Sequence, residues 1–502
     1  MARKSARRSA RRSPTRRSPL TTSAMVACWE DDPGEPKASP ALIPVTVDVP
    51  NQAAQPLAFK LDGKAPTPQV FQPGTIDFVY YATAAALRRT ADFWGDVVPA
   101  GTSWEVGKVL PVDVDSGVDL NAFYTRGGGG DAPGLHFFHA TVSGRTYFSG
   151  ESPDVCCHEM GHAVLDALRP QLFDAMSIEA AAFHESFGDM SAMLTALQVT
   201  SLTSGVLADT GGVLNHSSRL SRLAEQLGAA IRIGHPDAVD RDCLRNAVNS
   251  FFYTDPQNLP PGAPASQLSS EPHSFSRVFS GAFLDALAGM FALQGGTPSS
   301  DGLVEVSHDM GHLLVGGVLG ASVVPDYYSQ VAAHMIQAGE DAPFNGKYRD
   351  VLKSAFVRRG ILSLQAAATL GGVGRMAMRA AAAAGAPKGR LPITAISAAG
   401  FGLKKAVIKV HTASEPKQLA VTGAAMALGA SQSRSGQGAA ESYAEDLFQR
   451  GHVEVAKQAH ATMGLTHPHS FKTHRVVEVS GDLMLERKAF DCGYHFPFDG
   501  PF

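Results

Sequence analysis

The sequence predicts an α+β fold made of more than one structural unit. Two helices are expected in the first half of the chain, one around residues 158–162 and one over about residues 177–199. In the last 110 residues the patterns predict strands at 406–410, 476–479 and 483–485 and a helix within 440–461. The chain has 502 residues, of which 44% are hydrophobic, so it can form two or three hydrophobic cores.

The most informative motif is His158-Glu159-Met160-Gly161-His162. On a helix, residues four apart share a face, so the imidazoles of His158 and His162 can reach one metal ion. Glu159 would then point toward the position of a water bound to that metal. This arrangement is typical of the first half of a catalytic zinc site.

A catalytic zinc ion takes three protein ligands, and the second helix can supply the third. Glu185 is our candidate, because Asp189 follows it by four residues on the same helical face and can accept the outer N–H of a zinc-bound histidine. Glu179 and His184 are the alternatives, but neither has an acid at the fourth following position. Pro170 separates the helices and lets the chain turn back.

At these residues the chain resembles the thermolysin and fungalysin families of zinc metallopeptidases, whose third ligand is a glutamate in a Glu-x-x-x-Asp helix. The resemblance extends over about residues 76–362 and implies a two-lobed catalytic domain, with a mixed N-terminal lobe and an all-helical C-terminal lobe. Further matching segments, in chain order, are residues 78–94, 120–124, 243–246, 271–274, 332–336 and 348–356.

The resemblance implies roles for four more residues. Asn121 and Ala122 match an edge strand that pairs with the backbone of the substrate, as an extended peptide can add to a free strand edge. Arg245 matches an arginine that holds the substrate carbonyl, and His273 matches a histidine that stabilises the oxyanion.

We therefore expect a zinc-dependent endopeptidase that acts on peptides or proteins. Zinc would acidify its bound water and polarise the scissile carbonyl, while Glu159 would act as the general base and pass the proton to the leaving amine. Two alternatives stay open, namely an exopeptidase and an inactive scaffold that retains the metal site. Residues 393–502 would then carry the function of the scaffold.

The chain departs from the thermolysin pattern in two places. Residues 172–176 contain no tyrosine that could assist the oxyanion. Asp154 matches a calcium-binding acid, but no acid follows Asp189 until Asp209, so we expect the calcium site to be absent or altered. One catalytic Zn²⁺ is therefore the expected cofactor, and Ca²⁺ lacks the support of an acid cluster.

The expected organisation comprises a disordered basic arm at 1–40, an extension at 41–75, the metallopeptidase domain at 76–365, an Ala/Gly-rich linker or helix at 366–392 and a C-terminal α/β domain at 393–502. The formal net charge is −4, although the first 17 residues hold eight basic side chains and no acid. We expect this arm to be solvated rather than to bind nucleic acid.

No signal peptide is convincing, so we expect a cytoplasmic protein, with secretion as the alternative that the family resemblance suggests. Arg375 and Arg379 interrupt the apolar stretch 366–387, so no membrane span is expected. Five cysteines do not form a disulfide framework, and Cys156 and Cys157 are expected to be small buried side chains rather than metal ligands. The sequence leaves the oligomeric state open.

Overall fold

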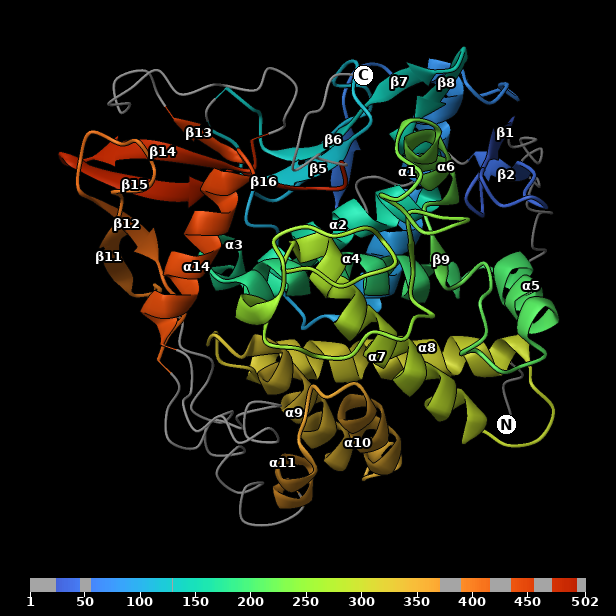
Figure 1. Cartoon of the computed structure of the whole chain (residues 1–502). Helices are drawn as coiled ribbons and strands as arrows, with labels where there is room; N and C mark the ends of the chain where they lie inside the picture. The colour runs from blue at the N-terminus through green and yellow to red at the C-terminus, as the bar shows by residue number, and fades with distance from the viewer. Residues whose placement is uncertain are drawn as a thin grey trace, which may run out of the picture.

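The computed structural model describes residues 24–45, 56–128, 130–370, 390–415, 435–455 and 472–493, which form a mixed α/β structure (Figure 1). The principal helices are α1 (Ile76–Val97), α2 (Pro153–Leu168), α3 (Gln171–Asp174), α4 (Ile178–Ala196), α5 (Thr200–Thr210), α6 (Glu225–Gly234), α7 (Pro272–Ala292), α8 (Ser300–Gly320), α9 (Tyr327–Glu340), α10 (Arg349–Arg358), α11 (Leu364–Thr369) and α14 (Gly436–Gln449). The strands are β1 (Ala24–Cys28), β2 (Ala41–Val45), β3 (Phe59–Leu61), β4 (Leu110–Asp113), β5 (Ala122–Thr125), β6 (Gly134–Phe137), β7 (His139–Val142), β8 (Arg145–Phe148), β9 (Arg222–Leu223), β10 (Arg245–Asn246), β11 (Ile393–Ser397), β12 (Val407–His411), β13 (Val453–Val455), β14 (His474–Val479), β15 (Asp482–Arg487) and β16 (Ala489–Asp491).

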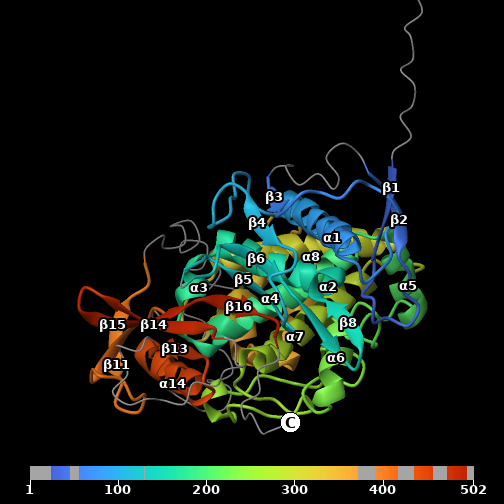
Figure 2. The same ribbon diagram turned by 90° about the horizontal axis from the view of Figure 1, so that it is seen from above.

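A five-stranded sheet in the order β16-β5-β6-β4-β3 lies over the central helices (Figure 2). β5 pairs antiparallel with β6 on one side and with β16 on the other, whereas β3, β4 and β6 run parallel. β5 and β16 come from sequence positions more than 360 residues apart. The last described strand of the chain therefore completes the sheet of the N-terminal half.

The core is concentrated where α1, α2, α4 and α7 meet. Trp94 of α1 is fully buried, stacks on Phe187 of α4 at a centroid distance of 5.0 Å and donates from its indole N–H to Ser191 Oγ at 2.9 Å. Ser191 Oγ in turn donates to the backbone oxygen of Cys157 in α2 at 2.8 Å. The polar groups of this core are thus hydrogen-bonded to one another, as buried polar groups require.

Two glycines allow α2 and α4 to cross closely. A Cβ atom on Gly161 would lie 2.8 Å from Ser191 Cβ and 3.0 Å from Gly188 Cα, and a Cβ atom on Gly188 would lie 2.5 Å from the His158 ring. The distances of 2.8 and 2.5 Å are shorter than two non-bonded carbon atoms tolerate, so no larger residue fits at either position without separating the helices. The small residue inside the His-Glu-x-x-His motif is therefore a packing requirement of this crossing.

The C-terminal region forms a second five-stranded sheet, in the order β11-β12-β15-β14-β13, with α14 packed beside it. The predicted strands at 406–410, 476–479 and 483–485 correspond to β12, β14 and β15. The helix predicted over 440–461 ends at Gln449 as α14, because Gly451 adopts a positive φ of 72° and the chain continues into β13; residues 456–461 lie outside the described residues. A short run of apolar residues is compatible with either a helix or a strand, so the sequence alone could not locate the end of this helix.

The C-terminal sheet contacts the helical body through backbone hydrogen bonds. Met176 N donates to His411 O at 2.9 Å, and Ser414 N donates to Val323 O at 2.8 Å. Arg487 donates to the backbone oxygen of Phe173 at 3.0 Å. The C-terminal region is thus packed against residues near the His-Glu-x-x-His motif.

The N-terminal range 1–40 differs in part from the expected disordered arm. Residues 1–23 lie outside the described residues, but residues 24–28 form β1, which pairs with β2, and Asp32 is fully buried. The cause is the composition, because residues 25–29 are apolar or aromatic whereas eight of the nine basic residues of this range lie before residue 18. Most of the predicted linker, residues 371–389, likewise lies outside the described residues.

Within the described ranges, α7 is the one helix that is long and apolar enough to cross a membrane. It is a core helix, since 78% of its apolar window is buried in the protein. A second candidate would arise only if α4 and α5, which meet at an angle of 101°, formed one broken span.

We predict that Gly161→Ala destabilises the protein by about 1–3 kcal/mol, because the added methyl group overpacks the crossing of α2 and α4. Gly234→Ala in α6 is the control, since a Cβ atom there meets nothing within 4 Å. That change should be neutral or stabilise by up to about 1 kcal/mol. Urea unfolding followed by circular dichroism measures both values, and equal effects of the two variants would contradict the close crossing.

Candidate metal centre

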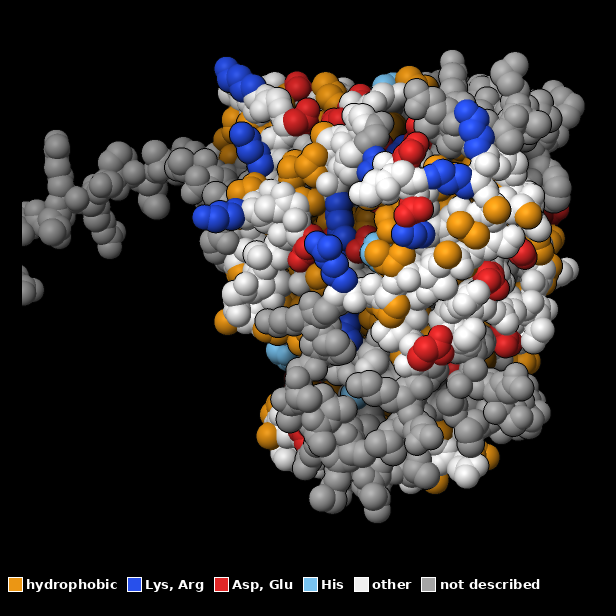
Figure 3. Space-filling model, turned by 90° about the vertical axis from the view of Figure 1, so that its left-hand side faces the viewer, with side chains coloured by type: hydrophobic (Ala, Val, Ile, Leu, Met, Phe, Trp, Pro, Cys, Tyr) orange, Lys and Arg blue, Asp and Glu red, His pale blue; other side chains and the backbone are white. Residues whose placement is uncertain are grey.

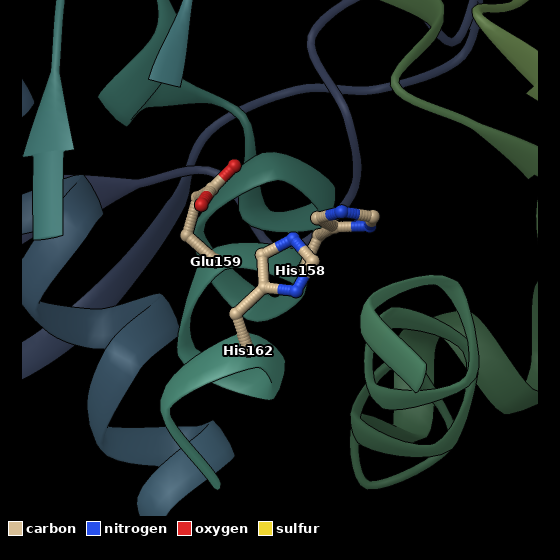
Figure 4. A group of neighbouring side chains, drawn as sticks. All are labelled: His158, Glu159 and His162. Atoms are coloured by element: carbon tan, nitrogen blue, oxygen red, sulfur yellow. The ribbon is translucent and has the colours of Figure 1, made fainter. Parts of the chain in front are cut away.

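Helix α2 presents the two histidines of the motif from a well-defined N-terminus. Ser152 caps the helix by accepting a hydrogen bond from Val155 N at 3.2 Å, and Pro153 occupies the first turn. The rings of His158 and His162 lie next to each other, with centroids 4.7 Å apart, and Glu159 projects from the adjacent side of the helix (Figure 4). Ligand atoms of the three residues all lie within 4.8 Å of one another, and the residues are buried.

Helix α4 brings Glu185 to both imidazoles. Glu185 Oε2 lies 3.4 Å from His158 Nε2, and Oε1 lies 3.8 Å from His162 Nε2. Both Nε2 atoms are buried and have no well-aligned hydrogen-bond partner among the described residues. Buried polar atoms are almost always paired, so unpaired atoms that converge on one point indicate a site for an ion. The residues predicted as ligands are therefore brought together.

The two alternative ligands occupy other positions. The carboxylate of Glu179 accepts hydrogen bonds from the Tyr253 hydroxyl at 2.6 Å and from Tyr328 N at 2.9 Å. His184 Nδ1 lies 3.3 Å from His162 Nδ1, on the side of that ring away from Glu185. When His162 donates this hydrogen bond from Nδ1, its Nε2 keeps a lone pair that a metal can bind. His184 thus orients a ligand, a role that its sequence position alone did not reveal.

Asp189 contacts the outer nitrogen of His158, as the spacing predicted. Its Oδ1 lies 3.2 Å from His158 Nδ1, and Ser280 Oγ donates to its Oδ2 at 3.1 Å. Arg245 donates to both oxygens of Asp189, at 2.8 and 3.4 Å. Burial acts to raise the pKa of Asp189, but Arg245 and His158 outweigh it and hold the pKa well below the ordinary value. Asp189 is therefore ionised and fixes the orientation of the His158 ring.

Arg245 lies at the centre, but its guanidinium is directed at Asp189 in the structure. It comes from the two-stranded β9-β10 ribbon and is mostly buried. The sequence resemblance suggested a contact with a substrate carbonyl, and that role stays a prediction. The contact that the structure shows is an indirect hold on His158 through Asp189.

Glu159 is fully buried, and neither of its carboxylate oxygens has a well-aligned hydrogen-bond partner among the described residues. Burial raises the pKa of Glu159 to about 8, against the opposing effect of His158 and of the Cys492 thiol beside it. A carboxyl group whose pKa lies near neutrality can both accept and release a proton at physiological pH.

His273 stands at the N-terminus of α7 and faces the centre. Its Nε2 lies 3.2 Å from Glu185 Oε2 and donates to the backbone oxygen of Asp491 at 2.6 Å, while its Nδ1 lies 2.7 Å from Glu271 Oε1. Burial acts to lower the pKa of His273, but Glu185 and Glu271 outweigh it and raise the pKa to about 10. The ring is therefore a charged double donor at neutral pH.

The strand edge at Asn121 and Ala122 is not free in the described structure, which corrects the expectation of an open edge. Cys492 N donates to Ala122 O at 2.8 Å, and a Cβ atom on Gly493 would lie 2.7 Å from Asn121 Cγ. β16 continues this pairing along β5. The sequence could not show this, because pairing between such distant segments leaves no local pattern.

A cavity of about 590 Å³ lies beside the centre, between the helical body and the C-terminal sheet. Its lining includes Glu185, Arg245, His273, Arg277, Arg487 and Cys492. The side of the molecule that carries the C-terminal sheet also shows several Lys and Arg side chains among hydrophobic ones (Figure 3). The cavity thus combines apolar walls with cationic groups, as ligand sites commonly do.

A second cluster of acids surrounds Asp154, which corrects the expectation that no acid cluster supports a cation there. Asp32 and Glu225 offer oxygens within 4.8 Å of Asp154, and all three residues are largely inaccessible to solvent. The acids were expected to follow Asp189 in the sequence, whereas Asp32 precedes α1 and Glu225 starts α6.

No model of a known protein family and no curated protein matches the sequence. The geometry of the centre therefore carries the functional argument.

We predict that the affinity for zinc rises at least tenfold per pH unit between pH 6 and 8. Burial opposes protonation of His158, but Asp189 and Glu185 raise its pKa to about 9 in the metal-free protein. Zinc must displace that proton, so its affinity increases as the pH increases. Asp189→Asn should flatten this dependence and weaken binding about 10–100-fold at pH 8. Competition with a chromophoric chelator measures both, and affinity that does not change with pH would contradict the assignment.

The acid cluster predicts that metal-free protein loses stability as the pH rises from 5 to 9. Burial and the neighbouring acids Asp32 and Asp154 raise the pKa of Glu225 to about 11. The folded chain thus retains protons that the unfolded chain releases above about pH 4.5, at a cost of about 1.4 kcal/mol per proton and pH unit. Glu225→Gln should reduce the slope. Thermal unfolding in the presence of a chelator measures it, and a stability that increases with pH in both proteins would contradict the prediction.

Proposed function

We propose that the protein is a zinc-dependent endopeptidase of the thermolysin and fungalysin type, with its cleft between a mixed lobe and a helical lobe. One observation carries this proposal. The buried Nε2 atoms of His158 and His162 lie 3.4 and 3.8 Å from the Glu185 carboxylate, with no other well-aligned partner among the described residues, and the buried Glu159 carboxylate lies beside them. Two imidazoles and one carboxylate suit zinc and leave a coordination position open for chemistry.

The residues around the centre can divide the work of hydrolysis. A bound zinc ion would acidify a water molecule and polarise the scissile carbonyl. Glu159 would accept the proton of the attacking water and transfer it to the leaving amine nitrogen. His273 would donate from Nε2 to the carbonyl oxygen as negative charge develops on it, which its raised pKa and its Glu271 partner favour.

The position of β16 supports an endopeptidase over an exopeptidase. Residues 489–493 lie in the groove at the centre, and the chain continues from both ends of this segment. A groove that holds the middle of a chain needs no pocket for a free terminus. The hydrogen bond from His273 to the backbone oxygen of Asp491 further supports a carbonyl position at this point.

The proposal is tested by cleavage of an unstructured protein at pH 7.5. Because β16 covers the strand edge, the assay uses the full chain and its Phe490→Ala variant, which removes about 3–5 kcal/mol of packing from β16. Phe401→Ala, which removes a stacking partner of Phe448 away from the groove, is the matched control. Zinc content is measured for every variant.

We expect internal cuts that a chelator abolishes and added zinc restores. In the Phe490→Ala background, Glu159→Gln should lower kcat/KM by a factor of about 10²–10⁴ while zinc stays bound, because the proton acceptor is lost. Stepwise removal of terminal residues would instead indicate an exopeptidase. One equivalent of bound zinc without cleavage in any variant would indicate an inactive scaffold.

A further inference from the structure

We propose that residues 489–493 form a plug that keeps the enzyme latent, and that Cys492 supplies the fourth ligand of the metal. The plug is defined as the segment from Ala489 to Gly493. The inference rests on the metal site proposed above and adds a regulatory role for the C-terminal region. It follows from three features of the structure, which are the pairing of the plug, its packing and the position of the Cys492 thiol.

The plug makes the contacts that an extended substrate would make. β16 pairs antiparallel with β5, with Phe490 opposite Tyr124 and Asp491 opposite Phe123. Cys492 N donates to Ala122 O, and the backbone oxygen of Asp491 accepts from His273 Nε2 at 2.6 Å. The peptide bond between Asp491 and Cys492 therefore lies between the strand edge and the cationic donor. A substrate cannot pair with β5 while the plug is in place.

Phe490 anchors the plug beside the metal ligands. Its ring stacks on His184 at a centroid distance of 3.9 Å and on His162 at 5.1 Å, and it packs edge-on against Phe173 at 5.5 Å. The guanidinium of Arg487 lies over the Phe490 ring, 4.1 Å from its centroid. Phe490 is 2% exposed, so its docking buries most of an aromatic side chain.

Cys492 lies beside the centre, where it lines the cavity together with Glu185, Arg245 and His273. It is 3% exposed and lies close enough to Glu159, Arg245 and Glu185 to interact electrostatically with all three. Unpartnered buried atoms of His158, His162 and Glu185 face the same space. Thiolate sulfur is a ligand that zinc prefers, so a fourth ligand from Cys492 would complete a tetrahedral set.

The other cysteines near the motif point elsewhere. The Cys157 thiol lies 3.0 Å from Thr90 Oγ1 of α1, and the Cys156 thiol donates to the backbone oxygen of Gly150 at 3.4 Å. Both positions agree with the expectation of small buried side chains. Cys492 differs from both in lying on the plug, whose Phe490 stacks on His162.

Latency follows from a balanced exchange of one proton and one ligand. When a metal binds, the Cys492 thiol would lose its proton to the solvent and its sulfur would occupy the position that water needs. The nucleophile would then be excluded, so the bond between Asp491 and Cys492 would not be cut. On release of the plug the sulfur would leave the metal and regain a proton from the solvent, and water would take its place.

Metal spectroscopy on the intact chain tests the ligand directly. The full chain is loaded with Co²⁺ for absorption and with Zn²⁺ for X-ray absorption. We expect a sulfur-to-cobalt charge-transfer band in the near ultraviolet and one sulfur neighbour at about 2.3 Å from zinc. Cys492→Ser should lose both signals while it retains one equivalent of metal. Cys28→Ser, a change at another buried free cysteine, should keep them.

Activity supplies the second readout. In the Phe490→Ala background, where the plug is loosened, Cys492→Ser should raise the rate of cleavage of an unstructured protein at least tenfold, and Cys28→Ser should leave it unchanged. Metal bound by the parent chain without sulfur would overturn the inference and leave the proposed function standing. A parent chain cut between Asp491 and Cys492 would show a substrate rather than a plug. Failure of the parent chain to bind any metal would refute the proposed function itself. The spectra of the parent chain decide the matter even if Cys492→Ser does not fold.

Discussion

The close crossing of α2 and α4 is the constraint on which the centre depends. Because Gly161 and Gly188 have no side chains at the contact, the two backbones approach until Glu185 lies within 4 Å of both imidazoles. Helices with larger residues at the contact lie about 8–10 Å apart, at which separation a glutamate of one helix reaches the face of the other less deeply. The same approach presses the His158 ring against α4, where Asp189 holds its outer nitrogen. Packing of small residues thus sets the positions of the groups that carry charge.

The burial of many ionisable groups is tolerable because these groups contact partners of opposite charge. Asp189 is bound by Arg245 and by His158, and His273 is bound by Glu271 and by Glu185. Removing one partner of such a buried pair typically costs about 3–5 kcal/mol, because the remaining charge is stranded away from water. The Nε2 atoms of His158 and His162, which have no well-aligned hydrogen-bond partner among the described residues, face Glu185, and a cation there would offset the charge of Glu185. The arrangement separates groups that maintain the fold from groups left available for chemistry.

The sequence predicted the parts of the centre that depend on helical periodicity. The spacing of His158 and His162, and of Glu185 and Asp189, fixed which side chains share a face, and the structure brings these faces together. It could not predict contacts made by strands or loops from distant positions. The pairing of β16 with β5, the acid cluster around Asp154 and the end of α14 at Gln449 all depend on tertiary contacts or on a single turn. Local pattern is silent about such contacts, since each segment alone is compatible with several partners.

In the proposed enzyme, the covalent link between the plug and the rest of the chain would explain how a modest contact suppresses activity. A short flexible link gives a tethered segment an effective concentration in the millimolar range. To displace the segment, a free substrate must exceed this concentration multiplied by the ratio of its own dissociation constant to that of the plug. β15 ends at Arg487 and β16 begins at Ala489, so the tether is the single residue Lys488 and the plug is held by a folded sheet rather than by a loose tail. Substrate alone would therefore compete poorly. Opening would require β15 to shift, or the segment after Arg487 to be cut. The C-terminal sheet thereby becomes the element through which any activating partner or protease would act on the metal centre.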